Sequence, residues 1–405
     1  MRKEEKTILR TGNNRFLKEY NQAGVLDLIR LHGTISRAEI SNLTGLSPTA
    51  AGKIVSALLK IGYIHEIGEG KSSGGRRPIL LELKPNSFFS VGVDLDIEGI
   101  RFVLIDITGS IICHSFNRIN KNLSFSDVIK KVKDITEKAA QDLKIDSERI
   151  VGIGISIPGI IDTENKKIIT APNMQWKDID LETYFNENFN VPVYVENEAM
   201  ASAICENWIG CCRDLSDFVC INIGTGIGSG IYTGGKLYRG VGGSAGEVGH
   251  IVVNEKGPKC GCGNYGCLET MASIASIVER VKNLPTYDSI SKKYIQGNDK
   301  DMDFDTVLKA ARDGEEAVKN ILMESAKYIG IAVSYIVNVL NPSKIVLGKE
   351  FVKYADIVID YIKEIVKCKA LKHPESFLEI SVSDIGENSS ALGAAFIPLK
   401  ILFGR

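Results

Sequence analysis

The sequence predicts an α/β protein in two parts, a small helical module at the N-terminus and a larger body made of two similar halves. Helical periodicity with turn residues fills most of residues 1–84, which end in two short apolar stretches. Two β-hairpin patterns, beginning at Phe89 and Phe218, each open a run of further strands and helices. One His and three Cys gather between 250 and 267. Alternating strands and helices are typical of layered α/β domains.

The composition is that of a globular protein with room for two or three domains. The chain has 405 residues, of which 44% are hydrophobic and 24% charged. No apolar run is long enough for a transmembrane helix, and the charged N-terminus leads into no apolar signal segment. We therefore expect a cytoplasmic protein with no membrane partner. Six of the nine Cys stand outside the cluster in mostly apolar contexts, which fits a reducing compartment.

Charge is unevenly distributed along the chain. Residues 1–85 hold 14 Lys and Arg against 8 Asp and Glu, a net charge of +6. The whole chain has a net charge of −1, so the remainder carries −7. This asymmetry suggests that only the N-terminal module meets an anion such as DNA.

The N-terminal module reads as helix, short helix, turn, helix. Residues 13–32 have helical apolar spacing, and a capping box formed by Ser36 and Glu39 opens a second helix over 37–44. Gly45 begins a turn, after which Ser47 caps a third helix, with Pro48 in its first position, that reaches about residue 61. This order predicts a helix-turn-helix.

Two short strands follow, over 63–67 and 78–83, and enclose a flexible basic tip. The module over 1–84 is therefore predicted to be a winged helix that binds DNA, with a small protein-binding helical domain as the alternative. Its third helix enters the major groove, and its wing reaches phosphates or the minor groove. The expected DNA contacts are Ser47, Thr49, Ala50, Lys53 and Ser56 on the helix and Lys71, Arg76 and Arg77 on the wing.

The body repeats one pattern. The hairpins over 89–109 and 218–236 have the same shape, and further apolar strands follow each of them. A duplicated α/β fold places a ligand cleft between its lobes. We expect a first lobe over 85–200, completed by a C-terminal helix over 387–405, and a second lobe over 201–386 that holds the cluster and the dimer contacts.

The turns of the two hairpins differ in chemistry. The second turn, over 224–230, is rich in Gly and can approach phosphates through backbone N–H groups. The first contains Asp94, Asp96 and Glu98, so three carboxylates stand where a phosphate needs donors and no negative charge. The first turn is a physical argument against tight ATP binding.

The His and Cys cluster has the spacing of a metal site. His250, Cys260, Cys262 and Cys267 follow the pattern His-x9-Cys-x-Cys-x4-Cys, which suits a tetrahedral structural zinc site. Glu247 and Glu269 lie in the same stretch, although the metal does not need them. We interpret this stretch as a metal-stapled loop that presents polar groups to a small ligand. The alternative is a flexible loop with three solvent-facing thiols.

These motifs together resemble the ROK family (repressors, open reading frames, kinases). The resemblance rests on the winged helix ending Gly75-Arg-Arg-Pro78, the Gly224–Gly230 turn, Gly246-Glu-Val-Gly-His250 and the Cys260–Glu269 box. It implies an actin/hexokinase-like two-lobed body that binds a sugar, and zinc held by the four residues of the cluster. Family members that carry a winged helix are usually bacterial transcriptional repressors.

The resemblance also implies the sugar contacts, with His250 presenting one ring nitrogen to zinc and the other to the sugar. The segments Glu196-Asn-Glu-Ala199 and Leu237-Tyr-Arg-Gly240 look most like the xylose-repressor branch of the family. The implied sugar contacts are Asn173, Asn197, Glu198, Glu247, His250 and Glu269.

The sequence departs from the family's kinases at three places. Kinases carry Asp-x-Gly-Gly-Thr in the first hairpin, an Asp base where Glu198 stands, and a Gly-Gly pair where this chain has Gly348-Lys-Glu350. We therefore expect no phosphoryl transfer and name no catalytic residue. The alternatives are an ATP-dependent sugar kinase, or a repressor that answers to glucose, N-acetylglucosamine or a phosphosugar. No basic residue stands out beside the sugar contacts.

The functional hypothesis is a sugar-responsive repressor that forms a homodimer or higher oligomer. The dimer presents two winged helices to a roughly palindromic operator, and sugar binding changes the closure of the lobes and weakens DNA binding. The sequence leaves open the operator, the identity of the sugar and the direction of its effect.

Overall fold

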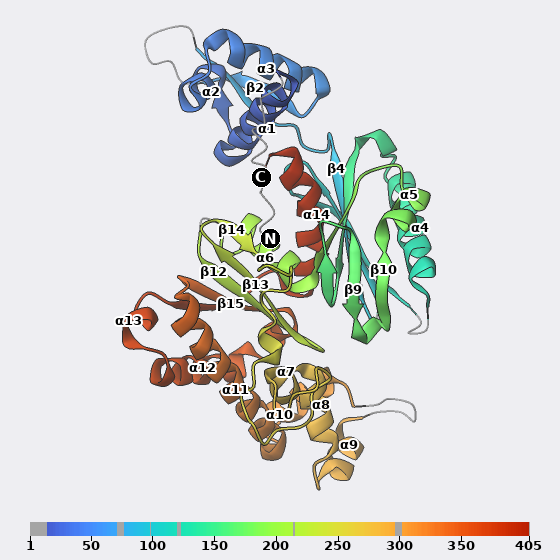
Figure 1. Cartoon of the computed structure of the whole chain (residues 1–405), viewed down its shortest axis with the longest axis vertical. Coiled ribbons are helices and arrows are strands. Elements are labelled where there is room, and N and C mark those ends of the chain that lie inside the picture. The colour runs from blue at the N-terminus through green and yellow to red at the C-terminus, as the bar shows by residue number, and fades with distance from the viewer. Residues whose placement is uncertain are drawn as a thin grey trace, which may run out of the picture.

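The computed structural model describes residues 14–70, 77–97, 99–119, 123–213, 215–295 and 302–404. A small N-terminal domain lies against one end of a two-lobed body (Figure 1). Among the helices described, none is long and apolar enough to cross a membrane.

The N-terminal domain is a winged helix. A capping box formed by Ser36 and Glu39 opens the second helix, and Ser47 caps the third. A two-residue strand before the second helix pairs with the wing, and this pairing was not predicted because two residues carry no strand periodicity. The wing residues Lys71 and Arg76 lie outside the described residues. The elements are α1 (Asn14–His32), β1 (Ile35–Ser36), α2 (Arg37–Thr44), α3 (Pro48–Ile61), β2 (Ile64–Glu69) and β3 (Ile79–Leu83).

The first lobe is built on a five-stranded sheet of order β11-β7-β4-β5-β6. A helical pair covers one face, and a small sheet of order β10-β9-β8 adjoins it. The outer strand β6 was not predicted, because it lies at an edge and is largely exposed. The elements are β4 (Phe89–Asp96), β5 (Gly99–Asp106), β6 (Ile111–Arg118), α4 (Phe125–Asp142), β7 (Ile150–Ile157), β8 (Ile160–Asp162), β9 (Lys167–Ala171), β10 (Trp176–Asp180), α5 (Leu181–Asn188) and β11 (Val193–Asn197).

The second lobe repeats this plan with a sheet of order β14-β13-β12-β15-β16. In both lobes an antiparallel hairpin is extended by a parallel strand, β7 beside β4 and β15 beside β12. The elements are β12 (Phe218–Ile223), β13 (Ile227–Thr233), β14 (Lys236–Tyr238), α7 (Leu268–Ala272), α8 (Ile274–Lys282), α9 (Tyr287–Tyr294), α10 (Phe304–Arg312), α11 (Glu316–Leu340), β15 (Lys344–Gly348), α12 (Ala355–Lys369), α13 (Lys372–Glu375) and β16 (Glu379–Val382).

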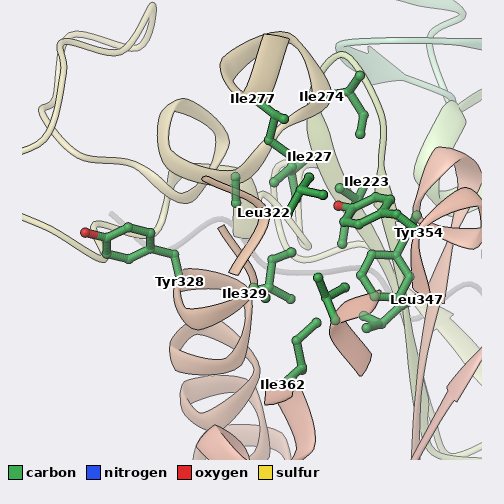
Figure 2. Packing of buried hydrophobic residues seen from close by; sticks show 14 of the residues in the cluster. Ile223, Ile227, Ile274, Ile277, Leu322, Tyr328, Ile329, Leu347, Tyr354 and Ile362 are labelled. Carbon is green, nitrogen blue, oxygen red and sulfur yellow. The ribbon is translucent and has the colours of Figure 1, made fainter. Parts of the chain in front are cut away.

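The core of the second lobe lies between its sheet and helices. Leu322 and Ile329 of α11 face Ile223 and Leu347 of the sheet, and Ile362 of α12 closes the cluster (Figure 2). Burial of these apolar side chains stabilises the packing of the helices on the sheet of the second lobe.

Two helices lie between the sheets, α6 (Glu198–Trp208) and the C-terminal α14 (Ser389–Leu402) (Figure 1). Glycines allow their close approach. A Cβ atom at Gly154 of β7 would lie 1.9 Å from the Ala394 carbonyl oxygen, and one at Gly393 would lie 1.7 Å from that of Ala201. The backbone of α14 therefore rests directly on the first sheet and on α6.

The winged helix packs against the C-terminal end of α6. The Arg30 guanidinium of α1 lies 4.4 Å from the centroid of the Trp208 ring and 5.6 Å from that of Phe403. Trp208 in turn stacks on Phe396 of α14, with 5.1 Å between ring centroids. The linker is also packed, since the rings of Tyr63 and Phe88 are 4.4 Å apart. The winged-helix domain and α6 thus share one apolar cluster.

Candidate functional site

A cavity of about 410 Å³ lies between the lobes, at the N-terminal end of α6. The turn of the second hairpin, the loop that follows β7 and the His and Cys loop form its walls. The structure brings all the predicted sugar contacts to this one cavity. They are Asn173, Asn197, Glu198, Glu247, His250 and Glu269.

Asn197 and Glu198 stand where β11 ends and α6 begins. The Asn197 side-chain oxygen accepts hydrogen bonds from the backbone N–H groups of Ala199 and Met200, and its nitrogen donates to the Gly159 carbonyl at 2.9 Å. The amide is therefore held in one orientation by capping α6. Glu198 follows as the first residue of the helix, where the helix dipole favours a carboxylate.

The four predicted metal ligands come together. All of their donor atoms lie within 4.8 Å of one another. The Cys260 sulfur lies 3.6 Å from His250 Nδ1, and the sulfurs of Cys262 and Cys267 are 3.6 Å apart. In a tetrahedral zinc site with Zn–S bonds of about 2.3 Å, two sulfurs lie roughly 3.7 Å apart. The cluster therefore fits a tetrahedral metal ion.

The thiols respond to different surroundings. A hydrogen bond from the Asn264 backbone lowers the pKa of Cys262, whereas burial raises that of Cys260 and raises that of Cys267 to about 12. A bound divalent cation favours the thiolates, so metal binding releases protons from the two buried thiols. Gly266 lies in a tight turn of this loop with φ of +65°. Only glycine fits there, because a Cβ atom would lie 1.5 Å from the backbone carbonyl oxygen of Asn254.

The metal loop carries two carboxylates to the cavity. Cys267 directly precedes α7, whose first turn contains Glu269, and the Glu269 Oε2 accepts a hydrogen bond from the Ile227 N–H at 3.0 Å. Glu247 lies beside His250, with its Oε2 3.9 Å from His250 Nε2. Burial raises the pKa of Glu247. One His250 nitrogen therefore faces the thiols while the other faces Glu247 and the cavity.

Asn173 is the sugar-site candidate contributed by the middle of the first lobe. It lies in a 3-10 turn, η2 (Pro172–Met174), and its side chain is exposed to the cleft. It belongs to the first lobe, whereas Glu247 and the metal loop belong to the second. A ligand held by both would touch both lobes.

The expectation that no basic residue stands beside the cleft was wrong. Lys349 follows β15 and is 5% exposed, and its Nζ lies 2.7 Å from Glu198 Oε2 and 3.8 Å from Asp96 Oδ2. Its φ of +59° is a left-handed conformation that glycine adopts more readily. The signal in the sequence was the replacement of the second Gly of the kinase Gly-Gly pair.

Carboxylates surround this lysine. Asp94 at the end of β4 is fully buried, and burial raises its pKa to about 7 although Lys349 opposes the shift. Its Oδ1 accepts a hydrogen bond from the Ser156 hydroxyl at 2.6 Å. Burial also raises the pKa of Glu350. Glu98, the third carboxylate expected in the first turn, lies outside the described residues.

The Gly-rich turn is covered by the protein's own side chains. A Cβ atom at Gly224 would lie 2.6 Å from Glu350 Oε2 and 3.2 Å from Lys349 Cδ. A carboxylate is therefore packed against the backbone that would have to approach a phosphate.

The predicted DNA-binding face is open to solvent. Ser47, Thr49, Lys53 and Ser56 are exposed on α3, and Ala50 is half-buried. The Ser47 hydroxyl also caps the helix by accepting from the Ala50 N–H at 3.2 Å. Arg77 at the described end of the wing is 68% exposed at its side chain.

The fold and site define a class of protein, a winged-helix DNA-binding domain joined to a two-lobed body with a polar ligand cleft. The ROK family model matches residues 90–400, and a model for winged helix-turn-helix DNA-binding matches residues 19–65. The chain belongs to the ROK family.

Relatives include both regulators and kinases. The xylose repressor of Caldicellulosiruptor bescii is 32% identical over 94% of this chain and 96% of its own. The solved structure of a ROK family transcriptional regulator, a homolog of the E. coli MLC protein, has a TM-score of 0.79 at 25% identity over 96% of this chain and 97% of that one. A ROK glucokinase from Streptomyces griseus, solved with glucose and AMPPNP, has a TM-score of 0.67 at 25% identity over 76% of this chain and 98% of that one.

Proposed function

We propose that this protein is a sugar-responsive DNA-binding repressor of carbohydrate utilisation genes and that its effector is xylose. The observation that carries the proposal is the polar cavity at the start of α6, together with a winged helix packed on the end of the same helix. The similarity to xylose repressors over nearly the whole chain supports the choice of sugar.

The cavity has the hydrogen-bonding groups that a free sugar needs. Glu198, Glu247 and Glu269 accept from hydroxyl groups, whereas Asn173 and the Nε2–H of His250 donate to hydroxyl oxygens. A sugar lacking a matching hydroxyl would leave buried polar groups unpaired, which provides selectivity. Asn197 acts mainly by capping α6 and fixing its neighbour Glu198.

Helix α6 connects this cavity to the DNA-binding domain. Its first residue is Glu198, and its last is Trp208, which lies under Arg30 of α1. Sugar contacts that shift the start of α6 would also move Trp208 at its end, which contacts Arg30 of the winged helix. In a dimer that movement changes the spacing of the two α3 helices and lowers operator affinity, with a coupling of about 1–3 kcal/mol.

We assign the His and Cys cluster to structural zinc. Zinc would be held by His250, Cys260, Cys262 and Cys267, and when bound it would fix the loop as a closed tetrahedral site. The chain's own part is to place His250 and the α7 turn that carries Glu269. Both of these side chains face the cavity.

We also propose that the body is a sugar-kinase fold without phosphoryl transfer. Glu198 stands at the position of the kinase base, but its carboxylate is paired with Lys349. Glu350 covers the Gly224 backbone, and Asp96 adds a second carboxylate beside Lys349. A nucleotide phosphate would meet carboxylates where it needs donors and a metal ion.

Two measurements on the metal-loaded protein test this function. A thermal-shift panel of xylose, glucose, N-acetylglucosamine and their phosphates, each with and without ATP, reports which ligand binds the native state. Fluorescence anisotropy with promoter DNA then reports whether that ligand lowers DNA affinity. We expect xylose alone to raise the melting temperature and to weaken DNA binding. A shift in melting temperature that requires ATP would favour a kinase. A shift with another sugar alone would indicate a repressor that responds to that sugar.

A further inference from the structure

Lys349 joins the two lobes at the sugar site. It begins η4 (Lys349–Lys353) in the second lobe, directly after β15. Its ammonium contacts Glu198 at the start of α6 and Asp96 at the end of β4 in the first lobe. Its side chain is 6% exposed, so bulk water does little to screen these charges.

The two oxygens of the Glu198 carboxylate have different surroundings, because the Lys349 ammonium bonds only one of them. Oε2 accepts the hydrogen bond from Lys349 at 2.7 Å. Among the described residues, no hydrogen bond is made to Oε1, and Glu198 lines the sugar cavity. An ionised carboxylate held in this way can only accept a hydrogen bond, so it requires a hydroxyl donor from the ligand.

The charge around Lys349 has a consequence for selectivity. The carboxylates of Glu198 and Asp96 lie 2.7 Å and 3.8 Å from this one ammonium. Its positive charge is therefore more than balanced by its neighbours, and it has little attraction left for a phosphate. A neutral sugar fits this arrangement, whereas a phosphosugar would bring a dianion toward several carboxylates.

We propose that Lys349 is a positioning residue of the sugar site, which holds Glu198 as an acceptor for a neutral sugar and links that contact to the position of the first lobe. The proposal rests on the proposed sugar-binding function. It gives a role to a residue that stands at a kinase glycine position. The Nζ atom of Lys349 contacts both Glu198, which we propose binds the sugar, and Asp96 of the first lobe.

The opposing explanation is that Lys349 only neutralises buried carboxylates. The two explanations differ for a charge-balanced double variant. Lys349→Met removes the cation that pairs with Glu198 and Asp96 and that also acts on the fully buried Asp94, so the melting temperature falls. Adding Asp94→Asn removes that acid. A purely structural role predicts that both stability and sugar affinity return, whereas a positioning role predicts that only stability returns.

Lys353→Met is the matched control. Lys353 lies in the same η4 turn and also forms ion pairs, with Glu387 at 2.9 Å and Asp305 at 3.4 Å, but it does not line the sugar cavity. Its loss tests whether any broken ion pair in this turn weakens sugar binding.

The experiment is isothermal titration with xylose, alongside melting curves, for the full-length metal-loaded protein and these three variants. We expect Lys349→Met to lower xylose affinity about tenfold or more, the scale of one charge-assisted hydrogen bond. The double variant should recover its melting temperature but stay weak for xylose, and Lys353→Met should bind within about twofold of the unmodified protein.

The outcomes separate the two proposals. If the unmodified protein binds xylose and Lys349→Met binds it equally well, or if the double variant regains full affinity, the positioning role is overturned and the repressor function stands. If the unmodified protein binds no free sugar, the proposed function fails and this inference fails with it. Tighter binding of xylose 5-phosphate than of xylose by the unmodified protein would overturn the charge argument.

Discussion

The two sides of the cleft differ in how accessible their charged residues are to a ligand. On the sugar side, Glu247 and Glu269 lie beside a metal loop and face an open cavity. On the other side, Asp94 and Lys349 are buried, Glu350 is half-buried, and both carboxylates interact electrostatically with Lys349. The duplicated fold provides equivalent turns, but the side chains around each turn decide what it offers to a ligand.

The difference follows from how each carboxylate is supported. Glu269 accepts a backbone N–H from Ile227, so its second oxygen can serve a ligand. Asp94 accepts a hydrogen bond from the Ser156 hydroxyl and is fully buried, so a ligand cannot reach it. In the proposed function, one side of the cleft therefore has carboxylates that can accept from a ligand, while Asp94 is occupied by Ser156 within the first lobe.

The largest expected effect comes from breaking the sugar side at the metal. Cys260→Ser removes one thiolate from the four ligands. We expect loss of bound zinc, a fall in the free energy of unfolding of roughly 2 kcal/mol or more, and no thermal shift with xylose. Metal analysis and melting curves measure these effects. Cys368→Ser, at an exposed thiol outside the cluster, is the control. Normal xylose response in Cys260→Ser would contradict the role given to the metal loop.

A matched pair of variants compares one carboxylate from each side. Glu269→Gln keeps the shape but loses a charged acceptor, so we expect xylose affinity to fall about tenfold or more. Glu350→Gln changes a carboxylate that faces Gly224 and does not line the sugar cavity, so affinity should stay within about twofold. Isothermal titration measures both. Equal losses in the two variants would remove the distinction between the two sides.

On the buried side, Asp94 should make the stability of the protein depend on pH. The pKa of Asp94 rises from an ordinary 3.8 to about 7, so the folded state holds a proton that the unfolded state releases. The stability contributed by this group is fully present below about pH 4 and is lost as pH rises through about 7. Asp94→Asn should therefore gain stability relative to the unmodified protein between pH 5 and pH 8. Melting curves over that range test the sign, with the exposed Asp360→Asn as control.

The smallest effect is expected outside the cleft. Gly52 lies inside α3, and a Cβ atom there would meet nothing within 4 Å. Gly52→Ala should stabilise the winged helix by about 0.5–1 kcal/mol and leave xylose affinity unchanged. Melting curves and sugar titration check this. An altered sugar affinity would mean that the DNA-binding domain and the cleft are coupled even without DNA.

Much of the architecture was predictable because its signals are local. The capping box of Ser36 and Glu39, Pro48 at the start of α3 and the two hairpins all lie within short stretches of chain. The metal cluster was predictable for the same reason, since its four ligands fall between 250 and 267. Strands β1 and β6 were missed because one is two residues long and the other is an exposed edge.

The sequence by itself determined the winged helix, the duplicated body and the metal spacing, because hydrogen-bonding caps, turns and periodicity act between near neighbours. Only the tertiary structure decided that Lys349 meets Glu198, although 151 positions separate them. It also decided that Arg30 rests on Trp208. Such contacts depend on how helices and sheets pack, and a single sequence carries no local pattern that records which distant side chains packing will bring together.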